Sequence, residues 1–174
     1  KIFEHELGEK YILKGPGCLN GATNRFIQIF SKKTYYKTIG MPDSIPHHVY
    51  IDIFPIDYVP EKKINRFFKG MWCNSLMAAA GCVELRDTIT KEIQKLMCSS
   101  FCGWFNMKLR LTLGWMLSFM SLEEWYRKID KALIVEQETK YCTSGTGRKH
   151  YHGETVNTDV FFPLKYSEFE GYPA

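Results

Sequence analysis

The sequence lacks the patterns that mark several common classes of protein. Its 174 residues contain no internal repeat, no low-complexity stretch and no CxxC pair, which argues against a solenoid, a disordered chain and a zinc ribbon. Of the six cysteines only Cys98 and Cys102 are close enough to share one face of a helix. Because no further metal ligands are suitably spaced around them, we expect reduced, buried thiols in a cytosolic protein. The first six residues are too charged for a secretory signal peptide.

Strong charge of either sign is also missing. Lys and Arg number 23 and Asp and Glu 19, which gives a net charge of +4. The basic residues are scattered, whereas nucleic-acid-binding proteins gather them on one face, so we expect no nucleic-acid partner. The charge supports only a weak attraction to anionic substrates or lipid surfaces. With 45% hydrophobic residues, the chain is expected to fold as a single domain over residues 1–174.

The third missing feature is a long, uninterrupted hydrophobic run. Residues 96–120 are strongly apolar, but Asn106, Lys108 and Arg110 lie near the middle of the stretch. At the centre of a membrane span each Lys or Arg costs roughly 2.5–3.5 kcal/mol. We therefore predict a helix that is soluble or lies on a membrane surface, and no membrane span.

Hydrophobic periodicity divides the chain into strands and loops over 1–60, a helical part over 61–140, and loop and strand over 141–174. Strands are predicted at 11–13, at 25–30 and 34–39 (as a hairpin), and at 160–162. Helices are predicted from Pro60 to about Gly81, over 88–97 and within 96–120. In the first helix the apolar stripe predicted from its spacing comprises Ile64, Phe67, Phe68, Met71, Trp72 and Leu76.

The clearest helix start in the sequence is at Ser121. Ser121 and Glu124 have the spacing of a capping box, and Met120 and Trp125 that of a hydrophobic staple. Glu123 and Glu124 are each four residues before a basic residue, which suits helical ion pairs. The predicted buried stripe of this structural helix is Leu122, Trp125, Tyr126, Ile129, Ala132 and Leu133.

The segment 47–57 is the most informative in the chain. Val49, Ile51 and Ile53 alternate with Tyr50, Asp52 and Phe54, as expected for the two faces of a strand. Pro55 cannot donate to a sheet, so we expect the strand to end there. A carboxylate flanked by two isoleucines is costly to bury alone. Asp52 is therefore expected either to meet a cation or hydrogen-bond donor, or to hold a metal ion.

Residues 48–60, HVYIDIFPIDYVP, resemble the "IDIFPLD-x-VP" signature of the LicD family. This family comprises phosphocholine transferases of bacterial surface polysaccharides, lipopolysaccharides and teichoic acids, related to the fukutin-type ribitol-phosphate transferases. The strand, charged turn and Thr34 upstream resemble the family's layout before this signature. Residues 162–171, FPLKYSEFEG, resemble its "fP…eFEG" segment, so the similarity runs in pieces from about residue 24 to the end.

The resemblance implies an α+β, nucleotidyltransferase-like fold in which a small mixed sheet is flanked by helices. It also implies a divalent metal, Mg²⁺ or Mn²⁺, with Asp52 as metal ligand and catalytic residue. The implied donor is CDP-choline or a similar compound, and the implied acceptor a glycan or glycolipid. The enzyme would be cytoplasmic, with peripheral contact to the inner face of the membrane. A site with few carboxylates suits Mg²⁺ when substrate phosphates complete the coordination.

The sequence departs from the family pattern in two places. No "PWDDDID"-like motif, which supplies the family's first metal-binding carboxylates, occurs in residues 1–46. We therefore expect that the chain is truncated before Lys1 and that it is inactive alone. Gln28 stands where the family pattern suggests a lysine.

Other candidate residues have a structural explanation beside the functional one. Asp57 is a candidate substrate-binding residue, but we favour a structural role for it, in an Asx turn or as the cap of the helix that follows. Arg148 and Lys149, in a glycine-containing loop, could bind phosphate or simply be solvated. His48, like His47 and the pair His150 and His152, could face the site or lie in an exposed loop. The alternative hypothesis is that the chain is not catalytic. It would then be an interaction domain, most simply one that docks on a membrane surface through residues 101–120.

Overall fold

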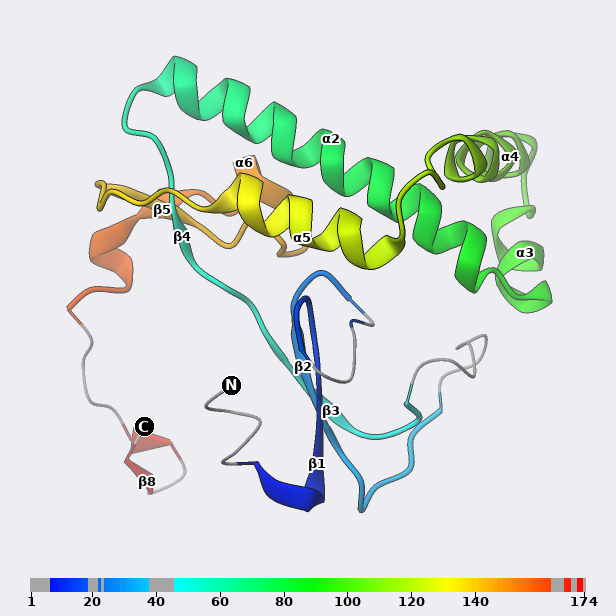
Figure 1. The fold of residues 1–174 in the computed structure, drawn as a ribbon, viewed down its shortest axis with the longest axis horizontal. Helices are drawn as coiled ribbons and strands as arrows, with labels where there is room; N and C mark the ends of the chain where they lie inside the picture. Colours follow the sequence, from blue (N-terminus) through cyan, green and yellow to red (C-terminus); the bar gives the residue numbers. More distant parts are fainter. Residues whose placement is uncertain are drawn as a thin grey trace.

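The computed structural model describes residues 7–18, 22, 24–37, 46–163, 168–169 and 172–173. Over these residues the chain is an α+β protein, as predicted, with two three-stranded sheets below and beside a layer of helices (Figure 1). Every described strand pair is antiparallel. The mixed sheet implied by the family resemblance is therefore not observed.

The first sheet has the order β1-β2-β3 and the second the order β4-β5-β6. A two-stranded hairpin of β7 and β8 lies near the C-terminus. The strands are β1 (Tyr11–Lys14), β2 (Ile27–Ser31), β3 (Tyr50–Ile53), β4 (Asp57–Tyr58), β5 (Tyr141–Thr143), β6 (Val156–Asn157), β7 (Glu168–Phe169) and β8 (Tyr172–Pro173).

The described helices are α2 (Lys63–Thr88), α3 (Lys91–Met97), α4 (Phe101–Met116), α5 (Leu122–Leu133) and α6 (His150–Gly153), with short 3-10 turns at Gly8–Lys10 and Thr158–Val160. Figure 1 shows α5 alongside α2, and α4 end-on near the C-terminal half of α2. None of the described helices has the length and apolar character needed to cross the bilayer.

The main core lies between α2 and α5 and is closed by α6 and β4. Its fully or nearly buried members are Val59, Cys73, Leu76, Met77, Ala80, Val83, Trp125, Tyr126, Ile129, Leu133 and Tyr151. Leu13 and Phe30 are also buried, in the first sheet, but lie outside this cluster. Cys73, Cys82 and Cys142 have free, buried thiols, as predicted. The thiols of Cys98 and Cys102 are also free, but Cys98 is only partly buried and Cys102 is exposed, so the prediction of buried thiols is wrong for these two.

Helix α5 follows its sequence signals closely. The Ser121 backbone N–H donates to Glu124 Oε2 at 2.8 Å, and the Glu124 N–H donates to Ser121 Oγ at 3.3 Å, so the capping box is confirmed. Arg127 pairs with Glu123 at 2.7 Å. The Glu124 carboxylate also accepts from the Ser121 hydroxyl. These hydrogen bonds, and then the nearby positive charges of Arg127 and Lys128, lower the pKa of Glu124.

Helix α2 differs from the prediction at both ends. It begins at Lys63 rather than at Pro60, and it continues past Gly81 to Thr88. The longer helix is stabilised because Cys82 and Val83 are buried and the Arg110 guanidinium from α4 donates to the Gly81 carbonyl oxygen at 3.1 Å.

The apolar stripe predicted for α2 is mostly wrong. Leu76 is buried, but the other predicted members, Ile64, Phe67, Phe68, Met71 and Trp72, are all exposed. The side that packs against α5 instead carries Cys73, Met77 and Ala80. The core-facing side of α2 therefore carries no aromatic residue, and the aromatic residues that define the predicted stripe lie on the exposed side.

Of these four predicted strands, two are confirmed. The strand at 11–13 is confirmed as part of β1, and that at 25–30 as β2, although β2 pairs with β1 and β3. Residues 34–37 form no strand, and 38–39 lie outside the described residues. Thr34 Oγ1 instead accepts from the Val49 N–H at 3.0 Å. Residues 160–162 are not a strand, because Val160 ends the 3-10 turn Thr158–Val160 and the next two residues follow it.

Candidate functional site

Asp52 lies on β3, opposite Gln28 of β2. Gln28 Nε2 donates to Asp52 Oδ1 at 2.8 Å, so the expected hydrogen-bond donor is present. Gln28 is buried, with 7% of its surface exposed, whereas Asp52 is exposed. The amide orients the carboxylate but carries no charge, so it leaves the negative charge of Asp52 available to a cation.

The exposure of Asp52 was not expected from its apolar neighbours. Within the described residues β3 pairs with β2 alone, and Ile51 is 67% exposed. The strand therefore presents both faces at the margin of the sheet instead of lying within an apolar core. A carboxylate in this position avoids the cost of desolvation.

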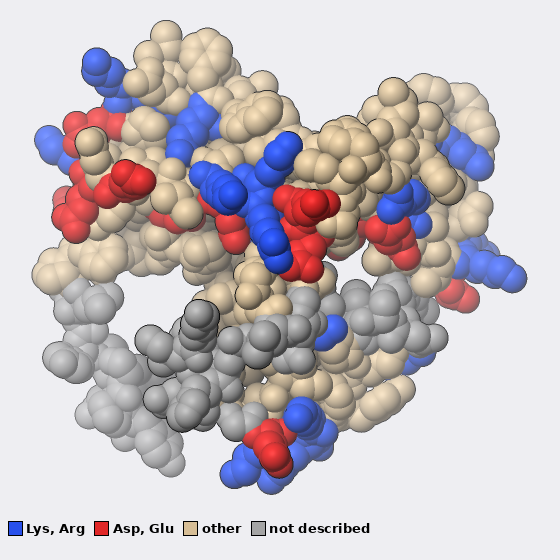
Figure 2. Space-filling view, viewed as in Figure 1, with Lys and Arg blue, Asp and Glu red and all other residues tan. Residues whose placement is uncertain are grey.

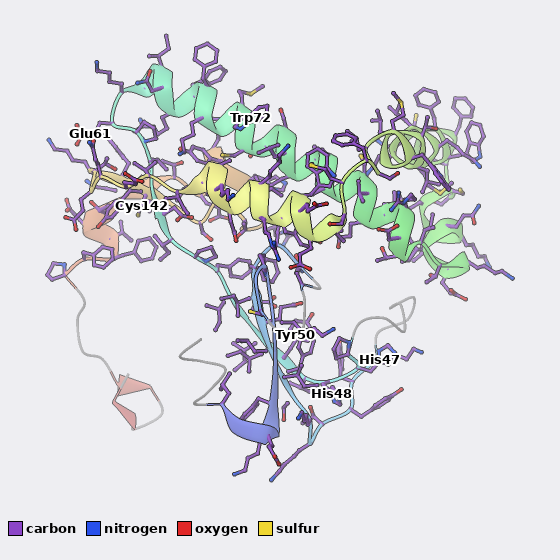
Figure 3. The ribbon with its side chains drawn as sticks, in the orientation of Figure 1. His47, His48, Tyr50, Glu61, Trp72 and Cys142 are labelled. Carbon is purple, nitrogen blue, oxygen red and sulfur yellow. The ribbon has the colours of Figure 1, made fainter. Side chains whose placement is uncertain are left out.

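His48 precedes β3 and holds the chain on the sheet. Its Nδ1 atom is in hydrogen-bond contact with the Thr34 carbonyl oxygen, and the neighbouring His47 ring lies 6.2 Å from the ring of Tyr35. Figure 3 shows His47, His48 and Tyr50 together in the part of the first sheet below the helices. The Nδ1 contact gives His48 a structural role; its predicted role in substrate binding remains a prediction.

Asp57 lies in the second sheet, on β4, opposite Thr143 of β5. Burial raises the pKa of its carboxyl group, and the positive charge of Lys69 lowers it in part. The carboxyl of Asp130, on α5, has its pKa raised to about 6 by burial and then by the negative charge of Asp57. Lys69 itself donates to the Ile134 carbonyl oxygen at 2.8 Å.

Asp57, Asp130 and Arg25 line one cavity of about 280 Å³, whose other walls are apolar or proline. Ile53 and Pro55 line the same cavity, but Asp52 does not. Successive residues of an extended segment point to opposite sides. Asp52 is therefore directed away from the cavity that Asp57 faces, and the structure does not bring these two predicted site residues together.

Nothing in the sequence singled out Asp130, Arg25 or Lys69. Asp130 follows the buried Ile129 in a helix of otherwise ordinary amphipathic pattern, and its proximity to Asp57 arises from the packing of α5 beside β4. The alternative that Asp57 caps a helix is not observed either, because α2 begins after Lys62 and has no side-chain cap.

Arg148 and Lys149 lie in the exposed part of the loop between β5 and α6. The backbone N–H of Gly147 donates to Ser144, that of Lys149 to Glu154, and that of His150 to Gly147. These amides are engaged within the loop and are not directed at an external anion. Any phosphate contact here would depend on the two side chains. His150 and His152 lie on the short helix α6, and both are exposed.

The residues present offer an incomplete metal site. Among the described residues no three His, Cys, Asp or Glu side chains are grouped so that they could hold a metal ion. Asp52 can supply one carboxylate, which fits a Mg²⁺ or Mn²⁺ ion whose remaining ligands come from substrate phosphates, water and carboxylates outside these residues.

Replacing Asp130 with asparagine is expected to remove a pH-dependent loss of stability. The ordinary pKa of an aspartate, 3.8, is raised to about 6 at Asp130 in the folded chain. Between these values the folded state holds a proton that the unfolded state has released, so stability falls as the pH rises from about 4 to 6. Asp130→Asn should thus melt at a higher temperature than the wild type at pH 7.

Thermal unfolding at pH 4.5 to 7.5, followed by circular dichroism, measures this difference. Asp159→Asn, at an exposed carboxylate, is the matched control and should follow the wild type throughout. A constant difference in melting temperature between Asp130→Asn and the wild type across this range would contradict the assignment.

Comparison of the chain with models of protein families, with curated protein sequences and with solved structures gave no match.

Proposed function

We propose that the chain belongs to a metal-dependent transferase of the LicD type. Such an enzyme moves phosphocholine, or a related phospho-alcohol, from a CDP-linked donor to a sugar hydroxyl of a surface-polymer precursor. The observation that carries the proposal is the exposed Asp52, within the motif at 48–60, oriented by Gln28 at 2.8 Å. A strand aspartate held by a neutral donor and open to solvent is suited to binding a cation.

In this proposal a bound Mg²⁺ or Mn²⁺ ion supplies charge neutralisation for the phosphates of the donor. Asp52 holds and orients the reacting groups at the edge of the first sheet. The acceptor hydroxyl oxygen bonds to phosphorus as the bond from phosphorus to the leaving CMP oxygen breaks. The hydroxyl proton passes to a base, a role that the Asp52 carboxylate can take.

Gln28 has a supporting part in the proposed site. Its side chain is anchored by burial and fixes one oxygen of Asp52, so the carboxylate is held in one orientation. Because the amide carries no charge, it orients Asp52 without neutralising it. The site differs in this respect from the family pattern, which suggests a lysine at this position.

Asp52→Asn is expected to abolish metal-dependent binding of CDP-choline by the full-length protein. The substitution keeps the shape and the hydrogen bond to Gln28 but removes the charge. Loss of even an outer partner of a metal ligand typically weakens metal binding by about 10- to 100-fold, and loss of the ligand itself should exceed that. Isothermal titration calorimetry with Mn²⁺ and CDP-choline measures the effect.

Asp159→Asn is the matched control for this experiment, because it removes the same charge from an exposed aspartate outside the motif. Melting temperatures of both variants should match that of the wild type. Binding by Asp52→Asn as tight as by the wild type, or binding that does not require the metal, would contradict the proposed function.

A further inference from the structure

Large exposed apolar side chains are concentrated on two helices. Phe101 is 78% exposed, Trp115 73% and Phe68 64%. We call the whole set the α2–α4 face; its members are Ile64, Phe67, Phe68, Met71 and Trp72 of α2, and Phe101, Trp104, Phe105, Leu109, Leu113, Trp115 and Met116 of α4. Trp72 of α2 is labelled in Figure 3. The face thus includes residues of α2 in addition to the segment 101–120 singled out in the sequence.

Both parts of the face lie on the same side of α2. Ile64, Met71 and Cys82 are separated by 7 and 11 residues, so they share one face of the helix. Helix α4 crosses α2 at Cys82, where a Cβ added to Gly114 would overlap the Cys82 carbonyl group. The exposed stripe of α2 therefore continues into α4, on the side opposite the core formed with α5.

The charges around the face are mostly positive. Helix α4 has no acidic residue and carries the basic residues Lys108 and Arg110. Helix α2 has no acidic residue between Lys63 and Val83. Lys62 and Lys63 are exposed at the start of α2, next to one carboxylate, Glu61. In Figure 2 the upper margin over α2 and α4 is largely uncharged, with blue patches, while red patches lie lower, at the left edge, over α5 and toward the C-terminal end of α2.

Lys108 indicates which partner the face suits. It is exposed and lies one helical turn from Trp104 and Phe105, and two turns from Trp115. The centre of a protein–protein interface is depleted of lysine. At a lipid surface, by contrast, a lysine among apolar side chains can extend to the phosphates, while Trp and Phe enter the region beneath them.

We propose that the α2–α4 face binds the surface of a bilayer that contains anionic lipids. Helices α2 and α4 lie parallel to the surface with their aromatic side chains at the headgroup level. Lys62, Lys63 and Lys108 contact anionic headgroups. The first sheet, with Asp52, lies on the other side of the helical layer in Figure 1 and stays in water. This inference is independent of the proposed transferase activity.

The test is flotation of the full chain with vesicles of phosphatidylcholine alone or mixed equally with phosphatidylglycerol. We expect co-flotation with the mixed vesicles, weakened by 0.5 M salt. Phe101→Ser combined with Trp115→Ser should lower the partition coefficient at least about tenfold, because burial of a single large apolar side chain already exceeds that factor. Lys108→Gln should weaken binding to the anionic vesicles about fivefold and leave binding to neutral ones unchanged.

The matched control is Tyr35→Ser combined with Val160→Ser, since these side chains are 76% and 69% exposed but lie outside the face. It should float like the wild type. Absence of flotation, or flotation unaffected by the Phe101 and Trp115 changes, would overturn the proposal. So would a stable dimer in lipid-free sedimentation that those changes dissociate, because the face would then be a contact between copies. Metal-dependent CDP-choline binding is measured without vesicles, so the two proposals fail separately.

Discussion

Ile129→Ala is expected to lower the free energy of unfolding by about 2–5 kcal/mol. Ile129 is completely buried on α5, in the cluster that joins α5 to α2. Truncation removes apolar contacts and leaves a cavity. The capping box at Ser121 and the long helix α2 limit how far the neighbouring side chains can move to fill it. Urea unfolding followed by circular dichroism measures the loss.

Ile64→Ala is the matched control, because it removes the same atoms from a helical isoleucine that is 64% exposed. Its free energy of unfolding should stay within about 0.5 kcal/mol of the wild type. Equal losses at the two positions would show that the core is not where the structure places it. The pair also tests the correction to the stripe predicted for α2.

Gly114→Ala is expected to destabilise the chain by roughly 1–3 kcal/mol, in spite of the better helix propensity of alanine. A Cβ at Gly114 would overlap the carbonyl group of Cys82 and lie 3.3 Å from the Cβ of Arg86. These are backbone and near-backbone atoms of α2, which cannot turn aside as the end of a side chain can. The helices must separate to make room. Thermal and urea unfolding measure the effect.

Gly81→Ala is the matched control in the middle of α2. The nearest atom that its Cβ would meet is Arg110 Nη2, at an ordinary distance of 3.6 Å. This variant should be as stable as the wild type or more stable by up to about 1 kcal/mol, because alanine favours the helix. A stabilising Gly114→Ala would instead mean that α4 does not cross α2 at Cys82.

Local signals in the sequence predicted α5 because every part of its pattern lies within the helix itself. The capping residues and the buried stripe are set by spacing along one element. For α2 the spacing predicted a helix but not which side is buried. Which side of α2 is buried depends on α5, which packs against the side that carries Cys73, Met77 and Ala80 and leaves the aromatic residues of α2 exposed. Such pairing is decided between elements and has no local pattern.

The candidate site likewise combines features that follow from local sequence with features that arise only from packing between elements. The motif at 48–60 drew attention to Asp52, and the expected cost of burying its carboxylate predicted a cation, a hydrogen-bond donor or a metal ion beside it; a donor is present, although Asp52 is exposed. The identity of that donor follows from the register of β2 against β3, which no pattern in either strand specified. Asp130 comes from α5 and is close to Asp57 only through tertiary packing. Sequence reasoning therefore pointed to a residue within a motif, whose function stays a prediction, and missed the residues that only the fold brings together.

The proline of this motif lies where one extended segment changes partners. Residues 50–53 pair with β2, and residues 57–58 pair with β5 of the other sheet. Residues 54–56, between the two ladders, are exposed, so water can satisfy the backbone amides of Phe54 and Ile56. Pro55 has no amide hydrogen to offer to either ladder, and it lines the same cavity as Asp57. Pro55 therefore marks the point at which the pairing of the chain passes from the first sheet to the second.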